Sequence, residues 1–400
     1  MLQEPRPPKL SPLGEVVFSS EPAAVPTPHL WCVVALQWRR NVAAAAAAAP
    51  YPECPPCAPV SLPRLNAGMS GQDSPGRLVS GLRRLTHVEE WLNQDAGQHA
   101  AELALKKKGL TTRRDYCFQA EPRSLEAQVE CLDAFLEYLP QRYPELYRVK
   151  GTGAGRTISV LSTGETHAVS DFAHAPLELC NRIVQEDLVL MRTADEQTAE
   201  HRHVMSAASV VFSFGDLDKK LGSPLAFIHA PVPGFEKDLA KLLNKTFDGL
   251  QATGACVHAP IGITRPRVLT ISRRARSLLI APVWRNNWAL VDNGALDNPS
   301  YGTPEALASI SKILPPETRW LKVEYQTLRR LPGTGYILFT IRTFLEQITV
   351  LARYPAAAAN LANSLSGMSQ PMRAYKGLVQ PQAQDEMLAY LASLAPTSAR

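Results

Sequence analysis

The chain has 400 residues, of which 45% are hydrophobic, and this length suffices for a substantial core in one elaborate domain or in two or three smaller ones. The formal net charge is only +5, and the basic residues are scattered, with clusters such as 106–108 and 273–274 that are typical of solvated faces. This pattern indicates no nucleic-acid partner. No apolar run approaches the roughly 20 residues that cross a bilayer, which predicts a soluble protein without a membrane span.

Residues 1–75 differ in composition from the rest. Prolines recur, residues 43–49 are an unbroken alanine run, and neither a helical nor a strand period persists, which predicts a disordered segment or a targeting segment. Arginines and alanines are typical of a transit peptide, but the glutamates at 4, 15, 21 and 53 are more than such peptides usually carry. Localisation therefore stays open between the cytosol and an organelle.

The seven cysteines are odd in number and irregular in spacing, which indicates a reducing compartment and no disulfide scaffold. Cys54 and Cys57 have the C-x-x-C spacing of a redox or zinc pair. No second pair accompanies them, however, and the proline-rich surroundings favour a coincidence.

A helix is predicted after Ser124, whose hydroxyl can cap it, and Pro140 is expected to end it. Its apolar residues recur at helical spacing: Leu125, Val129, Leu132, Leu136 and Leu139. Residues 157–161 and 166–169 then read as a β-hairpin. The glycines at 151, 153 and 155 favour a turn over a nucleotide-binding loop, because no strand precedes them and no capped helix follows.

Further strands are predicted at 204–214, 225–229, 283–291 and 336–342, and helices at 235–250, 303–312 and 384–394. Strands and helices that do not alternate regularly predict an α+β fold, with a mainly antiparallel sheet that helices flank. A polar strand over 323–332 is followed by a Pro-Gly turn and an apolar strand, and this pair suggests a pocket wall.

Two of these strands carry a family resemblance. "EYQTLRRLP" from Glu324 and "LFTIRTFL" from Leu338 resemble the C-terminal signature of the haem-dependent oxidative N-demethylase alpha-subunit-like proteins. Other segments follow in that family's order: "GLRRLTHVEEWL" from Gly81, "LPQRYPELY" from Leu139, "VQEDLVLM" from Val184, "KKLGSPLAFIHAPVPGF" from Lys219, "WRNNWALVD" from Trp284 and "AYKGL" from Ala374. The resemblance covers residues 78–395, which we expect to form one domain.

The resemblance implies a PAS-like haem-binding core with additional N- and C-terminal helices, and haem b as the iron cofactor. A haem needs an axial ligand in an apolar slot. His229 is the preferred ligand, because apolar residues precede it and a stiff turn with two prolines follows, although a hydrogen-bonded core histidine fits the pattern as well. The alternatives are His167, His174, His201 and His203, and the last two look like a surface cluster.

Polar residues that could serve such a site lie on the predicted strands. Arg285, between two tryptophans, could hold a propionate or bound dioxygen, or could stack on Trp288. Glu324, Gln326 and Arg330 share one strand face by period two, and adjacent Arg329 faces the other side. At most one of the two arginines can line the pocket, and the other is expected to pair with an acid such as Glu324. We expect Arg285 and Glu324 to take part in catalysis, and Gln326 and Arg330 to bind the haem.

The implied reaction is a monooxygenase-type oxidation of a methyl carbon on a secondary amine, which yields a smaller amine and formaldehyde. The partners would be a small amine, dioxygen and a separate reductase, because the chain shows no flavin, nicotinamide or iron-sulfur fingerprint. Glu324, Glu186 or Asp187 could attract the cationic amine. A haem-binding sensor or carrier without turnover, and a scaffold that has lost the cofactor, remain the other classes.

The chain departs from the family pattern in three places. Tyr325 stands where members usually have arginine, and residues 214–216 lack a tryptophan that often precedes "KKLG". Residues 252–281 look like an insertion, or like non-coding sequence retained by an error in the gene model. The first two departures put the substrate, and retention of activity, in question.

Overall fold

The computed structural model describes residues 81–85, 87–196, 202–213, 217–250, 282–298 and 314–394. Several expectations fall outside these ranges: the segment 1–75, the Cys54 and Cys57 pair, the insertion at 252–281, the helix at 303–312, His201 and residues 214–216. A single domain over 78–395 stays a prediction.

The described residues form a seven-stranded sheet with the order β1-β8-β9-β10-β6-β7-β2, in which every pairing is antiparallel. Its strands are β1 (Arg83–Arg84), β2 (Phe118–Ala120), β6 (Asp187–Thr193), β7 (His203–Ser209), β8 (Val283–Val291), β9 (Trp320–Arg330) and β10 (Ile337–Gln347). A smaller antiparallel sheet contains β3 (Tyr147–Lys150), β4 (Thr157–Val160) and β5 (Glu165–Ala168). The α+β prediction is confirmed, and the PAS likeness stays a prediction.

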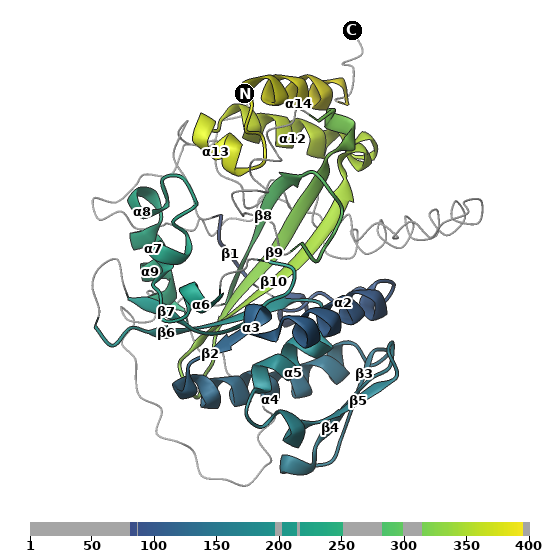
Figure 1. Ribbon diagram of the computed structural model, residues 1–400, viewed down its shortest axis with the longest axis vertical. Helices are drawn as coiled ribbons and strands as arrows, with labels where there is room; N and C mark the ends of the chain where they lie inside the picture. Colours follow the sequence, from purple (N-terminus) through teal and green to yellow (C-terminus); the bar gives the residue numbers. More distant parts are fainter. Residues whose placement is uncertain are drawn as a thin grey trace, which may run out of the picture. The chain divides into compact units, whose positions relative to one another are not determined.

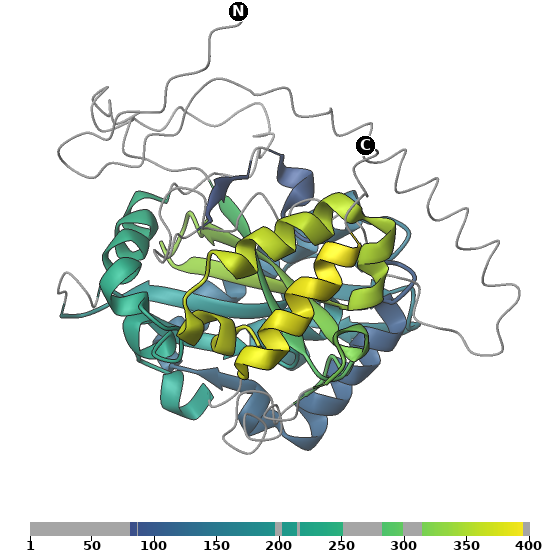
Figure 2. The same ribbon diagram turned by 90° about the horizontal axis from the view of Figure 1, so that it is seen from above.

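Three groups of helices cover the large sheet, each over its own apolar core (Figure 1). The first group is α2 (His99–Thr112), α3 (Arg114–Cys117), α4 (Leu125–Arg142) and α5 (Pro176–Ile183). The second group lies between β7 and β8 in the chain: α6 (Leu217–Lys220), α7 (Leu225–Ile228), α8 (Phe235–Asp238) and α9 (Ala240–Gly249). The third is α12 (Pro355–Ser366), α13 (Gln370–Tyr375) and α14 (Pro381–Ser393), and Figure 2 shows these C-terminal helices lying across the strands.

Short 3-10 turns join these elements: Val88–Glu90, Pro122–Ser124, Gly153–Gly155, Val169–Phe172, Pro316–Thr318 and Ile348–Arg353. The turn at Gly153–Gly155 lies between two strands of the small sheet, so the predicted turn is confirmed. The expectation that no strand precedes the glycines is wrong, because β3 ends at Lys150, but a strand and not a helix follows them. The predicted hairpin at 157–169, the strand at 283–291 and the hairpin formed by β9 and β10 are also confirmed. The predicted helix at 235–250 is divided at Leu239.

The strand predicted at 225–229 is wrong, because these residues form the short helix α7. Val204 pairs with Pro224 in an isolated bridge, and the chain then turns away from the sheet. A run of four apolar residues cannot distinguish a strand from a helix by period. His229 therefore follows a helix and not a buried strand.

Helix α4 differs from its prediction in three details. Ser124 has helical backbone angles, so its hydroxyl donates to the Glu121 carbonyl (2.7 Å) and does not cap the helix. Pro140 lies inside the helix, which continues to Arg142. Of the predicted apolar residues, Leu132, Leu136 and Leu139 are buried, whereas Leu125 and Val129 are about two-fifths exposed. The buried face also uses Ala127, Cys131 and Phe135.

The described cysteines, Cys117, Cys131 and Cys180, are buried free thiols. In the part of the chain that the structure describes, no helix is both long enough and apolar enough to cross a membrane. The basic cluster at 106–108 is only partly solvated, because Lys106 is completely buried.

Candidate functional site

Period two along β9 separates an apolar side of the sheet from a polar one. Leu321, Val323 and Tyr325 belong to the core under the C-terminal helices. The intervening Glu324 and Gln326 point to the opposite face. On that face Leu328 belongs to the core under α7 to α9, so the polar residues lie next to this core along the same strand.

A row of polar side chains crosses from β8 to β9 on this face. Arg285 is paired in register with Gln326, and Asn287 with Glu324. Arg285 Nε donates to Gln326 Oε1 (2.8 Å), and Gln326 Nε2 donates to Glu324 Oε2 (2.9 Å). Asn287 Nδ2 donates to the same carboxylate oxygen (3.1 Å). The structure thus joins three residues singled out in the sequence, Arg285, Glu324 and Gln326, in one hydrogen-bonded row.

Two lysines that the sequence did not single out complete the row. Lys322 Nζ lies 3.0 Å from Glu324 Oε1. Lys376, at the end of α13, donates to Asn287 Oδ1 (2.8 Å) and to the Trp288 carbonyl (2.7 Å). Lys322 could have been found by extending the period-two pattern of β9, whereas Lys376 arrives from a separate helix. We call these six residues the polar row: Arg285, Asn287, Lys322, Glu324, Gln326 and Lys376.

The polar row fixes the charge of its carboxylate. Burial opposes ionisation of Glu324, but the charge of Lys322 and the hydrogen bonds from Asn287 and Lys322, together with Lys376, outweigh it and lower the pKa of Glu324 to about 2. Thr343 lies opposite Glu324 on β10 and is buried, and among the described residues its hydroxyl has no hydrogen-bond partner. The row therefore presents an ionised carboxylate beside an unused hydroxyl.

His229 lies at the end of α7 and is half-buried, with its ring stacked on Phe235 (4.3 Å between centroids, 4° between planes). Nδ1 lies 2.9 Å from the Leu225 carbonyl, and because a carbonyl only accepts, Nδ1 carries the hydrogen. Nε2 is then the lone-pair nitrogen of the neutral ring. Burial, with the nearby charges of Arg285 and Lys220, outweighs the Leu225 bond and lowers the pKa of His229 to about 4.

The other described histidines differ in surroundings. His174 is exposed, and His167 lies 3.6 Å from Glu165. His203 is buried, not at the surface as expected, and its Nε2 lies 3.0 Å from Asp248 Oδ1. His99 is bonded through both ring nitrogens to Ser162 and Tyr147 (2.6 Å each). Among these histidines, only His229 has Nδ1 bonded to a carbonyl and a pKa that is lowered by the charge of a residue in the polar row, Arg285.

Arg330 does not join Glu324 and Gln326. Its guanidinium donates to the carbonyls of Phe247, Leu250 and Gly335 (2.5 to 2.9 Å), which ties the end of α9 to the turn after β9. The Arg329 guanidinium lies over the Trp91 ring (4.4 Å). The expected pairing of one of these arginines with Glu324 is therefore wrong, because Lys322 holds that carboxylate.

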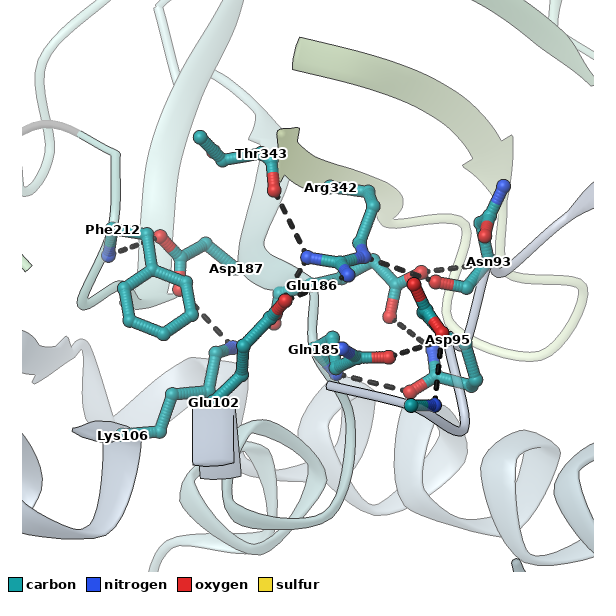
Figure 3. A network of polar contacts seen from close by, with 12 residues as sticks. Asn93, Asp95, Glu102, Lys106, Gln185, Glu186, Asp187, Phe212, Arg342 and Thr343 are labelled. Atoms are coloured by element: carbon teal, nitrogen blue, oxygen red, sulfur yellow. Dashed lines mark hydrogen bonds and ion pairs between the residues drawn. The ribbon is translucent and has the colours of Figure 1, made fainter. Parts of the chain in front are cut away.

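Glu186 and Asp187 belong to a separate, fully buried network (Figure 3). Asp187 accepts three backbone N–H groups from Val211, Phe212 and Ser213 (2.7 to 3.0 Å) and lies 3.2 Å from Lys106 Nζ. Glu186 accepts from Asn93 N (2.6 Å) and Gln94 Nε2 (2.5 Å). These contacts leave neither carboxylate available to attract a substrate.

The same network contains Arg342, whose guanidinium forms a forked ion pair with Glu102 (2.6 and 3.0 Å) and also donates to the Asn93 carbonyl (3.1 Å). Figure 3 shows these groups converging between α2 and the sheet. We call this set the buried ion network: Glu102, Lys106, Glu186, Asp187 and Arg342.

The departure at Tyr325 falls on the apolar side of the sheet. Its hydroxyl donates to the Glu90 carbonyl (2.8 Å), and its ring lies beside Trp284 (5.7 Å between centroids). This tyrosine holds the turn at Val88–Glu90 against β9, and its side chain points away from Glu324.

The family model for "Haem-dependent oxidative N-demethylase, alpha subunit-like" matches residues 81–276 and 275–384. The chain belongs to this family. The matched residues run from β1 into α14 and so include His229 and the whole polar row. The resemblance found in the sequence is thus confirmed, and the family's description is that of a haem-dependent oxidative enzyme.

Proposed function

We propose that this protein is a haem-dependent oxidoreductase that oxidises a methyl carbon of a secondary amine with dioxygen, giving a smaller amine and formaldehyde. Haem b, when bound, would supply the activation of dioxygen. Electrons would come from a separate reductase. The observation that carries the proposal is His229, whose Nδ1 is bonded to a carbonyl so that Nε2 is left as a donor atom, and whose ring is close enough to the polar row to be affected by the charge of Arg285.

Three features of His229 fit an axial ligand. The Nδ1–H bond to the Leu225 carbonyl fixes the tautomer and leaves Nε2 as the donor atom, which is the arrangement found in metal-bound histidines. The low pKa keeps the ring neutral, as ligation requires. The apolar side chains of α7 to α9 could cover a flat macrocycle. No group of three or more His, Cys, Asp or Glu among the described residues is arranged for a bare metal ion, and a haem iron needs no such group.

The polar row would bind the other partners. Arg285 could hold a propionate or a polarised oxygen, and Gln326 fixes the direction of its guanidinium. Glu324, ionised at neutral pH, would attract the cationic amine, and the Thr343 hydroxyl could accept one hydrogen bond from it. The three carbonyl bonds of Arg330 support a role in holding the fold in place of the haem-binding role expected from the sequence. We assign the PAS-like haem core to β6 through β10 with α6 to α9.

The test is the absorption spectrum of protein expressed with added haem, before and after dithionite. We expect a Soret band that shifts on reduction, and a loss of most bound haem in His229→Ala. His203→Gln is the matched control, because His203 is also buried and next to a phenylalanine but is bonded to Asp248.

Turnover separates the enzyme from a sensor. With a chemical reductant and dimethylamine, formaldehyde should form in the wild type. A haem-loaded protein that releases none would be a carrier or a sensor, and a folded protein without a Soret band would contradict the proposal altogether.

A further inference from the structure

Lys376 is a buried lysine whose position is fixed by its backbone. Only 8% of the residue is exposed. The next residue, Gly377, has φ +96°, and a Cβ there would lie 1.9 Å from the Leu290 carbonyl oxygen, so no other residue fits without a backbone shift. Leu290 N donates to the Lys376 carbonyl (2.8 Å), and Arg319 donates to the Gly377 carbonyl. The "AYKGL" segment is thus clamped against β8, with the amine directed at the polar row.

The hydrogen bonds of this amine match its neutral form. An ammonium has three N–H donors, whereas a neutral amine has two and a lone pair. Among the described residues, Lys376 Nζ has two hydrogen-bond acceptors, Asn287 Oδ1 and the Trp288 carbonyl, and both are uncharged. Within the described ranges, no carboxylate lies within ion-pair distance of Nζ. A buried ammonium without a carboxylate partner is costly, which favours release of its proton.

The surroundings of Lys376 bring the pKa of its amine close to neutral pH. Burial and the charge of Arg285 lower the pKa of Lys376, Glu324 raises it, and the result is about 7. The rings of Trp288 (5.3 Å) and Tyr375 (5.6 Å) contact Nζ and also favour the charged form. The other charged groups that face this corner are Lys322, which is paired with Glu324, and Arg319.

Asn287 connects the amine with the carboxylate. Its amide oxygen accepts from Lys376, and its amide nitrogen donates to Glu324. One short side chain therefore separates a lysine that can change charge from the carboxylate that would attract a cation. Thr343 Oγ1, buried opposite Glu324 and without a partner among the described residues, marks the place where a ligand could bind.

We propose that Lys376 determines when the site accepts a cationic amine: the ammonium ion binds beside Glu324 while Lys376 is neutral and is repelled when Lys376 carries a proton. This inference rests on the proposed function, because it assumes an amine substrate. Lys376 acts on the substrate through charge and through Asn287, so it is a specificity-determining residue and not a catalytic one.

The experiment measures dimethylammonium chloride binding by calorimetry to the ferric, haem-loaded protein without a reductant, so that no turnover occurs. If only the neutral form of Lys376 permits binding, the apparent affinity at pH 6 should be about tenfold weaker than at pH 8. Lys376→Met is always neutral and should bind equally well at both pH values. Lys376→Arg is always charged and should bind at least about tenfold more weakly than the wild type at pH 8.

The outcomes separate this inference from the proposed function. Equal affinity at pH 6 and pH 8 in wild-type protein that holds haem would overturn the role of Lys376 alone, and so would an unchanged pH trend in Lys376→Met. Absence of a Soret band from the same samples would overturn the proposed function. Should Lys376→Arg fail to fold, the comparison of the wild type with Lys376→Met still decides the inference.

Discussion

The buried ion network and the polar row differ in how they treat their charges. In the network, Arg342 meets Glu102 in a forked pair, Lys106 meets Asp187, and the remaining lone pairs of Asp187 are filled by backbone N–H groups. In the polar row, Lys322 pairs directly with Glu324, but neutral amides separate the other charges: Gln326 links Arg285 to Glu324, and Asn287 links Glu324 to Lys376.

We infer from this difference that the charges of the buried ion network stabilise the fold, whereas those of the polar row can respond to a ligand. A closed pair loses its stabilisation when either partner is removed, because the other is left buried and unpaired. A row joined by amides leaves one group, Lys376, free to change its protonation without breaking an ion pair. Figure 3 shows the closed arrangement, in which several segments of the chain meet around Arg342.

The largest effect is expected from a substitution that breaks the buried ion network. Arg342→Met leaves Glu102 buried without its partner and should lower the free energy of unfolding by roughly 3–5 kcal/mol, measured by urea denaturation. The double variant Glu102→Leu, Arg342→Met removes both charges and should recover much of that loss. If the double variant is as unstable as Arg342→Met, the pair is not what stabilises this region.

The next effect is the pH dependence of stability due to His99, which lies beside the network. Burial, with the charges of Arg342 and Lys106, outweighs Asp95 and lowers the pKa of His99 to about 4, below its usual 6.5. The unfolded chain then binds this proton more readily than the folded one. The contribution of His99 to the free energy of unfolding is therefore fully present above pH 6.5. It decreases by about 3 kcal/mol as the pH falls to about 4.

The measurement compares urea unfolding of the wild type and His99→Gln between pH 4 and pH 7. Glutamine does not titrate there, so the variant should lose less stability over this range. Parallel pH profiles for the two proteins would show that His99 does not contribute in this way.

A smaller effect tests how Lys376 is held in place. Gly377→Ala combines a strained φ with a Cβ that meets the Leu290 carbonyl, and it should cost roughly 1–3 kcal/mol and displace the amine from Asn287. Gly164→Ala is the matched control, since φ is +73° but nothing lies within 4 Å of the added Cβ. We expect the control to be milder and to leave dimethylammonium binding unchanged, whereas equal effects would mean that strain alone, and not contact with β8, matters at Gly377.

The sequence predicted the parts of the fold that depend on local pattern. Alternation along β9 and a Pro-Gly turn were enough to place the β9–β10 hairpin and to group Glu324 with Gln326. The short apolar run before His229 has no decisive period, so its helix was missed. The α+β class followed from the order of these elements, even where a single element was wrong.

Contacts between distant residues were out of reach of any local pattern. Glu102 and Arg342 are 240 positions apart, and Lys106 looks in the sequence like one member of a solvated basic cluster. Lys376 lies in a segment without apolar periodicity, and its burial follows from the approach of Gly377 to Leu290. The residues that join charge to charge across the fold could therefore only be identified once the strands and helices were placed.

The smallest and most specific effect concerns coupling inside the polar row. Because the Glu324 carboxylate raises the pKa of Lys376, Glu324→Gln should lower that pKa further. The midpoint of dimethylammonium binding should then move to lower pH, and the affinity at pH 8 should fall because the attracting charge is lost. Glu317→Gln, which removes an exposed carboxylate outside the row, is the control for a general change in surface charge. A midpoint that stays near pH 7 in Glu324→Gln would mean that Asn287 does not couple the two groups, and the polar row would then be a set of separate contacts in place of a responsive unit.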